Sequence, residues 1–290
     1  MKRAEPYLYT APAVLLIAAV MLAPLITGLS YAFHDIILLD PLSGDFVGFD
    51  HFREMMEDDS FWTALSNTVS WTVLSVSLQF GFGLALALLL NRPMPGRRLV
   101  QALVFLPWAV PGFLSGLTWA WLFNPVIGPL PHWLTSLGLM TSAENILSDP
   151  HLALWGPIAA NVWWGIPFFA ITLLAALQSI SKEIYEAASI DGAGPWLRFS
   201  RITLPLLAPT ILLTVMLRTV WVANFAELIV VMTKGGPADS TQILSSYIFS
   251  LAFQRLDFGY ASAVSAILLL LLLAYAASVM ALRRVMADRG

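Results

Sequence analysis

The sequence has 290 residues, of which 58% are hydrophobic and 11% are charged, with a formal net charge of −3. Soluble globular domains carry about 25% charged residues, so this composition excludes an ordinary soluble protein. The mean hydropathy of +0.77 points the same way. The chain has no cysteine, which excludes disulfides and thiol chemistry. Apolar windows longer than the roughly 20 residues that cross a bilayer recur along the chain, so an all-α membrane protein is expected.

Six apolar segments follow one another and are predicted to form a single transmembrane domain over residues 1–290. Their expected bounds are 11–33, 61–90, 99–123, 152–177, 206–233 and 260–282. The first follows Lys2 and Arg3 as a signal peptide would, but its length indicates an uncleaved span with a kink at Pro24. A loop with one short helix near residues 130–137 is expected between the third and fourth spans.

Basic residues are divided unevenly between the loops, which predicts the orientation of the chain. The side that carries both termini and the loop 179–203 has Lys2, Arg3, Arg92, Arg97, Arg98, Lys182, Arg198, Arg201, Arg283, Arg284 and Arg289. The opposite side has only Arg53, Lys234 and Arg255. Both termini and the loop 179–203 are therefore predicted to be cytoplasmic. The acidic segment 35–59 then lies outside, where it either faces a protein partner or keeps a loop solvated.

The sequence contains no motif that indicates catalytic chemistry. The sequence has no Gly-x4-Gly-Lys-Ser/Thr phosphate loop, so the chain is not expected to bind ATP in the usual way. Its four histidines have no metal-ligand spacing, and no Ser-His-Asp arrangement or carboxylate pair stands out. No catalytic residue, metal site or bound cofactor is therefore predicted for this chain, and it is not expected to be an enzyme.

A polar stretch, residues 186–209, separates two apolar spans and reads EAASIDGAGPWLRFSRITLPLLAP. Good helix formers begin it, and a glycine-proline break follows at residues 191–195. A second amphipathic run then places Trp196, Phe199 and Ile202 at helical spacing. The pattern predicts two short helices joined by a glycine elbow at the membrane surface.

This stretch resembles the EAA loop of binding-protein-dependent ABC importer permeases, and most closely that of the carbohydrate-uptake permeases for maltose and glycerol-3-phosphate. The resemblance covers about residues 60–282 and implies the type I ABC importer permease fold. In that family the loop forms coupling helices that dock in a cleft of the ATP-hydrolysing subunit. The coupling residues that it implies here are Glu186, Ala187, Ala188, Asp191, Gly192 and Ala193.

The resemblance also implies partners and a location. The partners are a second homologous permease, two subunits that hold ATP and Mg, an extracytoplasmic solute-binding protein and membrane lipid, with no nucleic acid. The location is the bacterial cytoplasmic (inner) membrane. The implied cargo is a sugar or sugar-like solute, and a disaccharide, monosaccharide, polyol, sulfo-sugar or glycerophosphate all remain open.

Four residues are candidates for the solute path. Asn224 and Glu227 lie deep in the fifth span and match that family's span-five signature, although they equally fit helix packing. Trp119 and Trp163 offer ring faces on which sugars stack, with packing as the simpler interpretation. Arg218 lies about half a turn from Glu227 around the helix, so the two are not expected to pair.

Two other functions remain open at this stage. One is an ion-coupled secondary transporter that uses Glu227, and the other is a membrane scaffold without a path. The first would be expected to show inverted repeats, which we do not find. The loop motif favours the importer over both.

Overall fold

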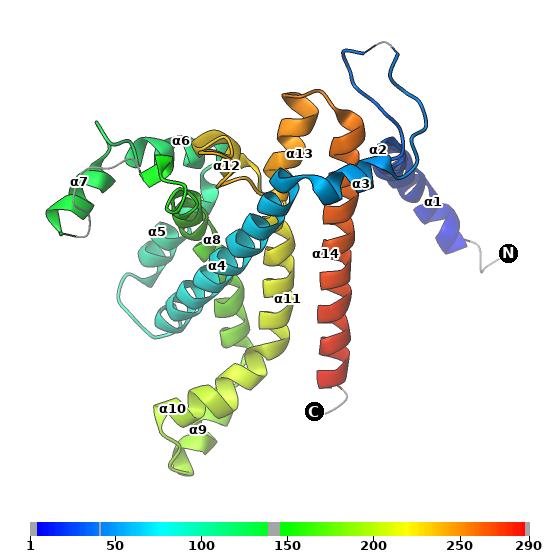
Figure 1. The fold of residues 1–290 in the computed structure, drawn as a ribbon. Helices are drawn as coiled ribbons and strands as arrows, with labels where there is room; N and C mark the ends of the chain where they lie inside the picture. The colour runs from blue at the N-terminus through cyan, green and yellow to red at the C-terminus, as the bar shows by residue number, and fades with distance from the viewer. Residues whose placement is uncertain (1–4, 41, 139–145, 288–290) are drawn as a thin grey trace. The chain divides into compact units, whose positions relative to one another are not determined.

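The computed structural model describes residues 5–40, 42–138 and 146–287, and the described chain is helical (Figure 1). Lys2, Arg3 and Arg289, which contribute to the predicted orientation, lie outside these residues. Within them, five helices are long and apolar enough to cross a membrane, and a sixth candidate is a pair of helices bent by 94°. The chain divides into two compact units, Met1–Phe61 with Tyr247–Leu271, and Trp62–Ser246 with Leu272–Gly290.

The first unit begins with a long apolar helix. It runs through α1 (Glu5–Ile17), the π-helical turn η1 (Ala18–Leu22) and α2 (Ala23–Tyr31). The π turn ends at Leu22, and only Ala23 separates it from Pro24, where the sequence predicts a kink. Proline donates no backbone hydrogen bond and crowds the preceding turn, so widening that turn relieves the clash. The unit also holds α3 (Asp50–Glu57), most of α13 (Leu244–Phe253) and the first part of α14 (Phe258–Ala287).

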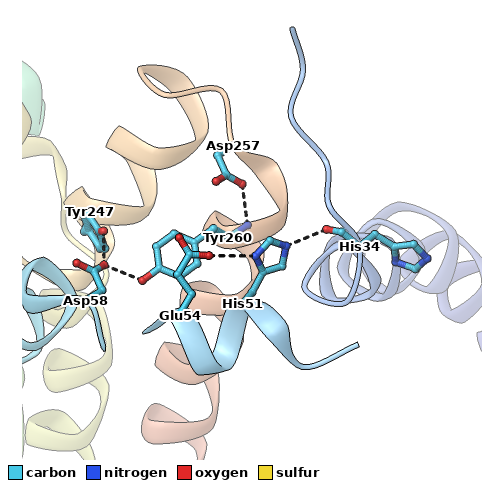
Figure 2. A network of polar contacts seen from close by, with 7 residues as sticks. All are labelled: His34, His51, Glu54, Asp58, Tyr247, Asp257 and Tyr260. Atoms are coloured by element: carbon cyan, nitrogen blue, oxygen red, sulfur yellow. Dashed lines mark hydrogen bonds and ion pairs between the residues drawn. The ribbon is translucent and has the colours of Figure 1, made fainter. Parts of the chain in front are cut away.

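Asp58, which directly follows α3, joins α13 and α14 of this unit (Figure 2). Its Oδ2 accepts hydrogen bonds from the hydroxyls of Tyr247 on α13, at 2.6 Å, and Tyr260 on α14, at 2.7 Å. Its Oδ1 accepts from the backbone N–H of Ser60 and so caps the helix that begins at residue 59. Burial alone would raise the pKa of Asp58, but these hydrogen bonds together hold it below the usual value.

A second contact in this unit brings α3 against the first turn of α14. The ring of His51 donates from Nε2 to the carbonyl of His34 at 3.1 Å, and its Nδ1 lies 3.7 Å from Glu54 (Figure 2). Gly259 makes this approach possible, because a methyl group there would lie 2.6 Å from His51 Nε2. The start of α14 is therefore fixed by the close contact of Gly259 with His51 as well as by the hydrogen bond from Tyr260 to Asp58.

The second unit is organised around one central helix, α8 (Trp155–Ser179), and α5, α6, α11 and α12 pack against it. Phe169 and Leu173 of α8 are fully buried in its core. The other elements of this unit are α4 (Asp59–Leu90), α5 (Arg97–Ala109), α6 (Gly112–Leu122), α7 (Pro129–Ser136), η2 (Ile146–Ser148), α9 (Lys182–Ile190), α10 (Pro195–Arg198), η3 (Phe199–Thr203), α11 (Leu204–Ala223) and α12 (Glu227–Met232).

Two predicted spans are interrupted. The segment 99–123 is not one helix, because α5 and α6 meet at a bend of 94° between Val110 and Pro111. Val110 is extended, as the residue before a proline usually is. The segment 206–233 breaks at residues 224–226, between α11 and α12. The short helix expected near residues 130–137 is confirmed as α7.

Replacing Asp58 with Asn should lower the free energy of unfolding by about 1–3 kcal/mol at neutral pH, because two tyrosine hydroxyls lose a charged acceptor. Since the folded-state pKa is lowered, ionised Asp58 stabilises the fold above its usual pKa of 3.8 and loses this effect as pH falls through the lowered value. The stability gap between wild type and Asp58→Asn should therefore close on acidification. Thermal unfolding of the purified transporter across pH measures it.

The matched control is Glu57→Gln, which removes an exposed neighbouring carboxylate. Its unfolding temperature should follow that of the wild type at every pH. An equal loss in both variants would contradict a specific role for Asp58.

Candidate functional site

The stretch that is predicted to form the coupling helices folds as a helical hairpin with a defined elbow. The hydroxyl of Ser181 caps the start of α9 by accepting from the N–H of Glu183 at 3.3 Å. At the other end, Gly192 has φ +78°, and its N–H donates to Ser189 O at 3.1 Å. The N–H of Ala193 donates to Ala188 O at 2.8 Å. These two bonds form a Schellman motif, which needs a left-handed residue where the sequence places glycine.

Side chains then tie the two arms of the hairpin together. Arg198 donates from Nη1 to the hydroxyl of Ser189 at 2.9 Å, and the hydroxyls of Tyr185 and Thr203 lie 2.9 Å apart. Sequence analysis did not identify Tyr185 and Thr203, since nothing in their spacing reveals the contact before the elbow is built. Two side-chain hydrogen bonds therefore join the arms of the hairpin.

The hairpin presents an exposed face to a partner. Glu186, Ala187, Asp191 and Gly192 are exposed, whereas Ala188 and Ala193 are half-buried. Ile190 is 87% exposed and Trp196 is 76% exposed, which is unusual for large apolar side chains next to charged neighbours. Apolar side chains gathered on a polar hairpin are typical of a surface that another protein covers.

The second arm of the hairpin is continuous with the fifth span. α10 passes into η3, and η3 passes into α11 without a break (Figure 1). In η3 the backbone N–H of Leu204 donates to Phe199 O, one residue further back than in an α-helix, immediately before Pro205. Figure 1 shows the hairpin at the end of α11 opposite α12. α10, η3 and α11 therefore form one continuous helical segment.

A polar cluster lies in the middle of the same helices. Arg218 of α11 is only 2% exposed, and Gln79 of α4 and Asn161 of α8 are fully buried. Arg218 Nε donates to Gln79 Oε1 at 2.6 Å and Nη2 reaches Asn161 Oδ1 at 3.4 Å, while Gln79 Nε2 donates to the Asn161 carbonyl at 2.9 Å. The guanidinium also lies 5.2 Å from the ring centre of Trp164, within cation–π range.

The cluster needs a glycine opposite it. A methyl group at Gly165 would lie 2.3 Å or slightly more from atoms of Gln79 and Arg218, so both side chains use the space that the missing Cβ leaves. The ion pairs in the described residues involve His51 and Arg53, not Arg218. Arg218 therefore neither extends to the membrane surface nor pairs with Glu227, and neutral amides hold it.

A cavity of about 300 Å³ opens beside this cluster. Arg218 and Trp164 line it, together with Trp221, Asn224 and Phe225 at the end of α11. Asn224 Nδ2 donates to the Val220 carbonyl at 2.9 Å, which leaves its Oδ1 as an acceptor. An amide, a guanidinium and aromatic rings around one cavity suit a solute rich in hydroxyl groups.

The two interrupted spans meet beside this cavity. Trp164 Nε1 donates to the carbonyl of Val110 at 2.8 Å, at the bend between α5 and α6. The Trp164 ring stacks on Phe225, with centres 5.2 Å apart, at the break between α11 and α12. The Glu227 side chain packs against Gly112, where a methyl group would also meet the Phe225 ring at 2.8 Å. Trp164 therefore connects both breaks.

The tryptophans selected from the sequence lie elsewhere. Trp119 packs on Trp163 and on Phe123, with ring centres 6.0 Å apart in each pair. The structure brings Trp164 and Trp221, rather than Trp119 and Trp163, to the cavity beside Asn224. Trp163 and Trp164 are neighbours in sequence and point to different surroundings, so only tertiary structure separates them.

The long apolar helices and the interrupted spans are those of a multi-pass helical membrane protein. Among the described residues, no three His, Cys, Asp or Glu side chains form a group that could hold a metal ion. The model of the family described as "Binding-protein-dependent transport system inner membrane component" matches residues 79–289. The chain belongs to this family of ABC importer permeases, whose ATPase is a separate subunit, and is a multi-pass protein of the inner membrane.

Similar proteins cover nearly the whole chain. The trehalose/maltose transport system permease MalF of Thermococcus litoralis is 35% identical, with 93% of this chain and 90% of that protein covered. The sulfoquinovosyl glycerol transport system permease SmoG of Agrobacterium fabrum is 34% identical, with 90% and 84% covered. A bacterial ABC transporter involved in import of the acidic polysaccharide alginate has a chain with TM-score 0.82 and 27% identity, covering 98% of this chain and 96% of its own.

Replacing Gly165 with Ala should destabilise the protein by about 1–3 kcal/mol, because the methyl group displaces Gln79 and Arg218 from their hydrogen bonds. Gly81→Ala is the matched control, since a methyl group there meets no atom within 4 Å. Thermal midpoints of the purified transporter measure both. If the two variants unfold at the same temperature, the polar cluster does not depend on this close approach.

Proposed function

We propose that this chain moves a sugar or sugar-like solute that an extracytoplasmic binding protein delivers. It would act beside a second, homologous permease and two ATP-binding subunits that hold ATP and Mg. The observation that carries the proposal is the hairpin formed by α9 and α10, because its elbow is exposed and its second arm continues into α11. The proposed orientation places this hairpin and both termini on the cytoplasmic side, where ATP is available.

The hairpin would convert motion of the ATP-binding subunit into motion of the span. Ile190 would enter a cleft of that subunit, with the elbow at Asp191 and Gly192 as the part seated deepest. Closure of the two ATP-binding subunits would then displace α10. Because the arms are bonded through Arg198 and Tyr185, the hairpin would not absorb this displacement by opening.

The displacement would reach the solute cavity through α11. Arg218 and Asn224 lie on this helix or at its end, and Trp164 joins the neighbouring breaks. A shift of α11 would therefore change the walls of the cavity and the angle between α5 and α6. Helices interrupted at the solute site are expected in a transporter that alternates between inward- and outward-facing states.

The cavity supports a carbohydrate as cargo. Aromatic rings pack on the apolar faces of sugars, while Asn224 Oδ1 accepts from hydroxyls and Arg218 offers only donors. The two relatives described above are named for trehalose or maltose and for sulfoquinovosyl glycerol, and the structural neighbour for alginate. All three names contain a saccharide or a glycosyl group, which favours this class for the present chain.

Gly192→Ala should uncouple ATP hydrolysis from uptake, because alanine at φ +78° costs about 1 kcal/mol or more and displaces the elbow. Gly194→Ala is the matched control, since Gly194 has φ −67° and open space around its Cα. Uptake and binding-protein-stimulated ATP hydrolysis would be compared in reconstituted complexes. Uptake that is equally unaffected in both variants would refute the assignment of the elbow.

Glu227→Ala should reduce uptake severalfold while the complex still assembles, if the carboxylate contributes to the path beside Gly112. Glu227→Gln should recover part of the uptake, because the amide keeps the hydrogen-bonding shape without the charge. Uptake assays would be paired with size-exclusion analysis of the complex. Loss of assembly in Glu227→Ala would instead assign this residue to helix packing.

A further inference from the structure

A groove lies behind the coupling hairpin and is separate from the solute cavity. It has a volume of about 720 Å³. Leu88 and Leu177 form part of its wall, and Trp196 and Phe199 come from the second arm of the hairpin. Two basic side chains, Arg92 and Arg198, also line it. We call this site the hairpin groove.

The ends of three apolar helices place the hairpin groove at the boundary between hydrocarbon and water. α4 ends at Leu90, α8 ends at Ser179 and α11 begins at Leu204. Leu88 and Leu177 belong to the last turns of α4 and α8, whereas Arg92 lies just beyond α4. One side of the groove is therefore at the depth of acyl chains, and the other is at the depth of head groups.

The charges of the groove favour an anion. No carboxylate lines it. The exposed side chain of Arg92 has no hydrogen bond or ion pair with any residue that the structure describes. Arg198 uses Nη1 for Ser189 and still lines the groove. Guanidinium groups provide only donors and bind phosphate oxygens well, so a phosphate matches these two side chains.

We propose that the hairpin groove binds an anionic phospholipid of the adjoining leaflet. Its phosphate contacts Arg92 and Arg198, and an acyl chain lies along Leu88 and Phe199, with Trp196 at the interface as tryptophan prefers. The apolar wall favours a lipid over a free phosphate and over a polar segment of an ATP-binding subunit. The bound lipid would brace the hairpin against α4 and α8, and this part of the inference rests on the proposed function.

The test uses the complete transporter in nanodiscs. Phosphatidylglycerol or phosphatidylcholine with brominated acyl chains quenches tryptophan fluorescence on contact, and Trp196→Phe isolates the contribution of Trp196. Quenching of Trp196 should be stronger with brominated phosphatidylglycerol. Arg92→Gln should reduce this preference about fivefold, the effect expected for one basic residue near an anionic surface. Arg98→Gln, which changes an exposed arginine in the first turn of α5 outside the groove, should leave it unchanged.

Several results would overturn the proposal. Equal quenching by both lipids would remove the preference for an anionic head group, and no quenching would mean that a protein partner fills the groove. If Arg92→Gln and Arg98→Gln reduce the preference for phosphatidylglycerol equally, basic residues attract anionic lipid to the surface in general and the groove is not a specific site. Displacement of the lipid by inorganic phosphate would indicate a small-anion site. Fluorescence quenching reports lipid contact without any transport. A failed uptake assay would therefore refute the proposed function and leave the test of lipid binding valid.

Discussion

A guanidinium inside an apolar helical bundle must have partners, because leaving its donors unpaired away from water is costly. Arg218 meets this requirement with the amides of Gln79 and Asn161 and with the Trp164 ring. These contacts fix the mutual positions of α4, α8 and α11. The hairpin continues from one end of α11, and the cavity lined by Trp164 and Asn224 opens at the other end. The buried arginine therefore fixes the geometry between the hairpin and this cavity.

Prolines decide where the surrounding helices depart from regular geometry. Both π turns end one residue short of a proline, Pro24 in the first unit and Pro205 in the second. Pro111 instead follows an extended residue and bends α5 away from α6. Since each proline removes one donor and crowds the turn before it, the chain adjusts locally. The bend at Pro111 leaves the Val110 carbonyl to accept from Trp164, which binds α8 to this bend.

The exposed hairpin and the buried cluster have complementary chemistry. The hairpin is held by neutral hydroxyl contacts and one arginine at the surface, and it keeps large apolar side chains outside. Such a surface is stable alone and still gains from burial against a partner. The cluster of Arg218, Gln79 and Asn161 is buried, and its polar groups bond one another, while Arg218 also lines the cavity. The exposed apolar hairpin and the buried polar cluster therefore lie at different places along one continuous helical segment.

The sequence determined the class of protein, the approximate spans and the elbow, because hydropathy, glycine and proline act locally. Gly192 is an example, since a left-handed residue after a helix requires little beyond its neighbours. The partners of Arg218 and the choice of Trp164 over Trp163 depended on the tertiary structure. Those contacts join α4, α8 and α11, which are far apart in the chain, and adjacent tryptophans on one helix face different surroundings. Packing alone decides which of them meets the cavity.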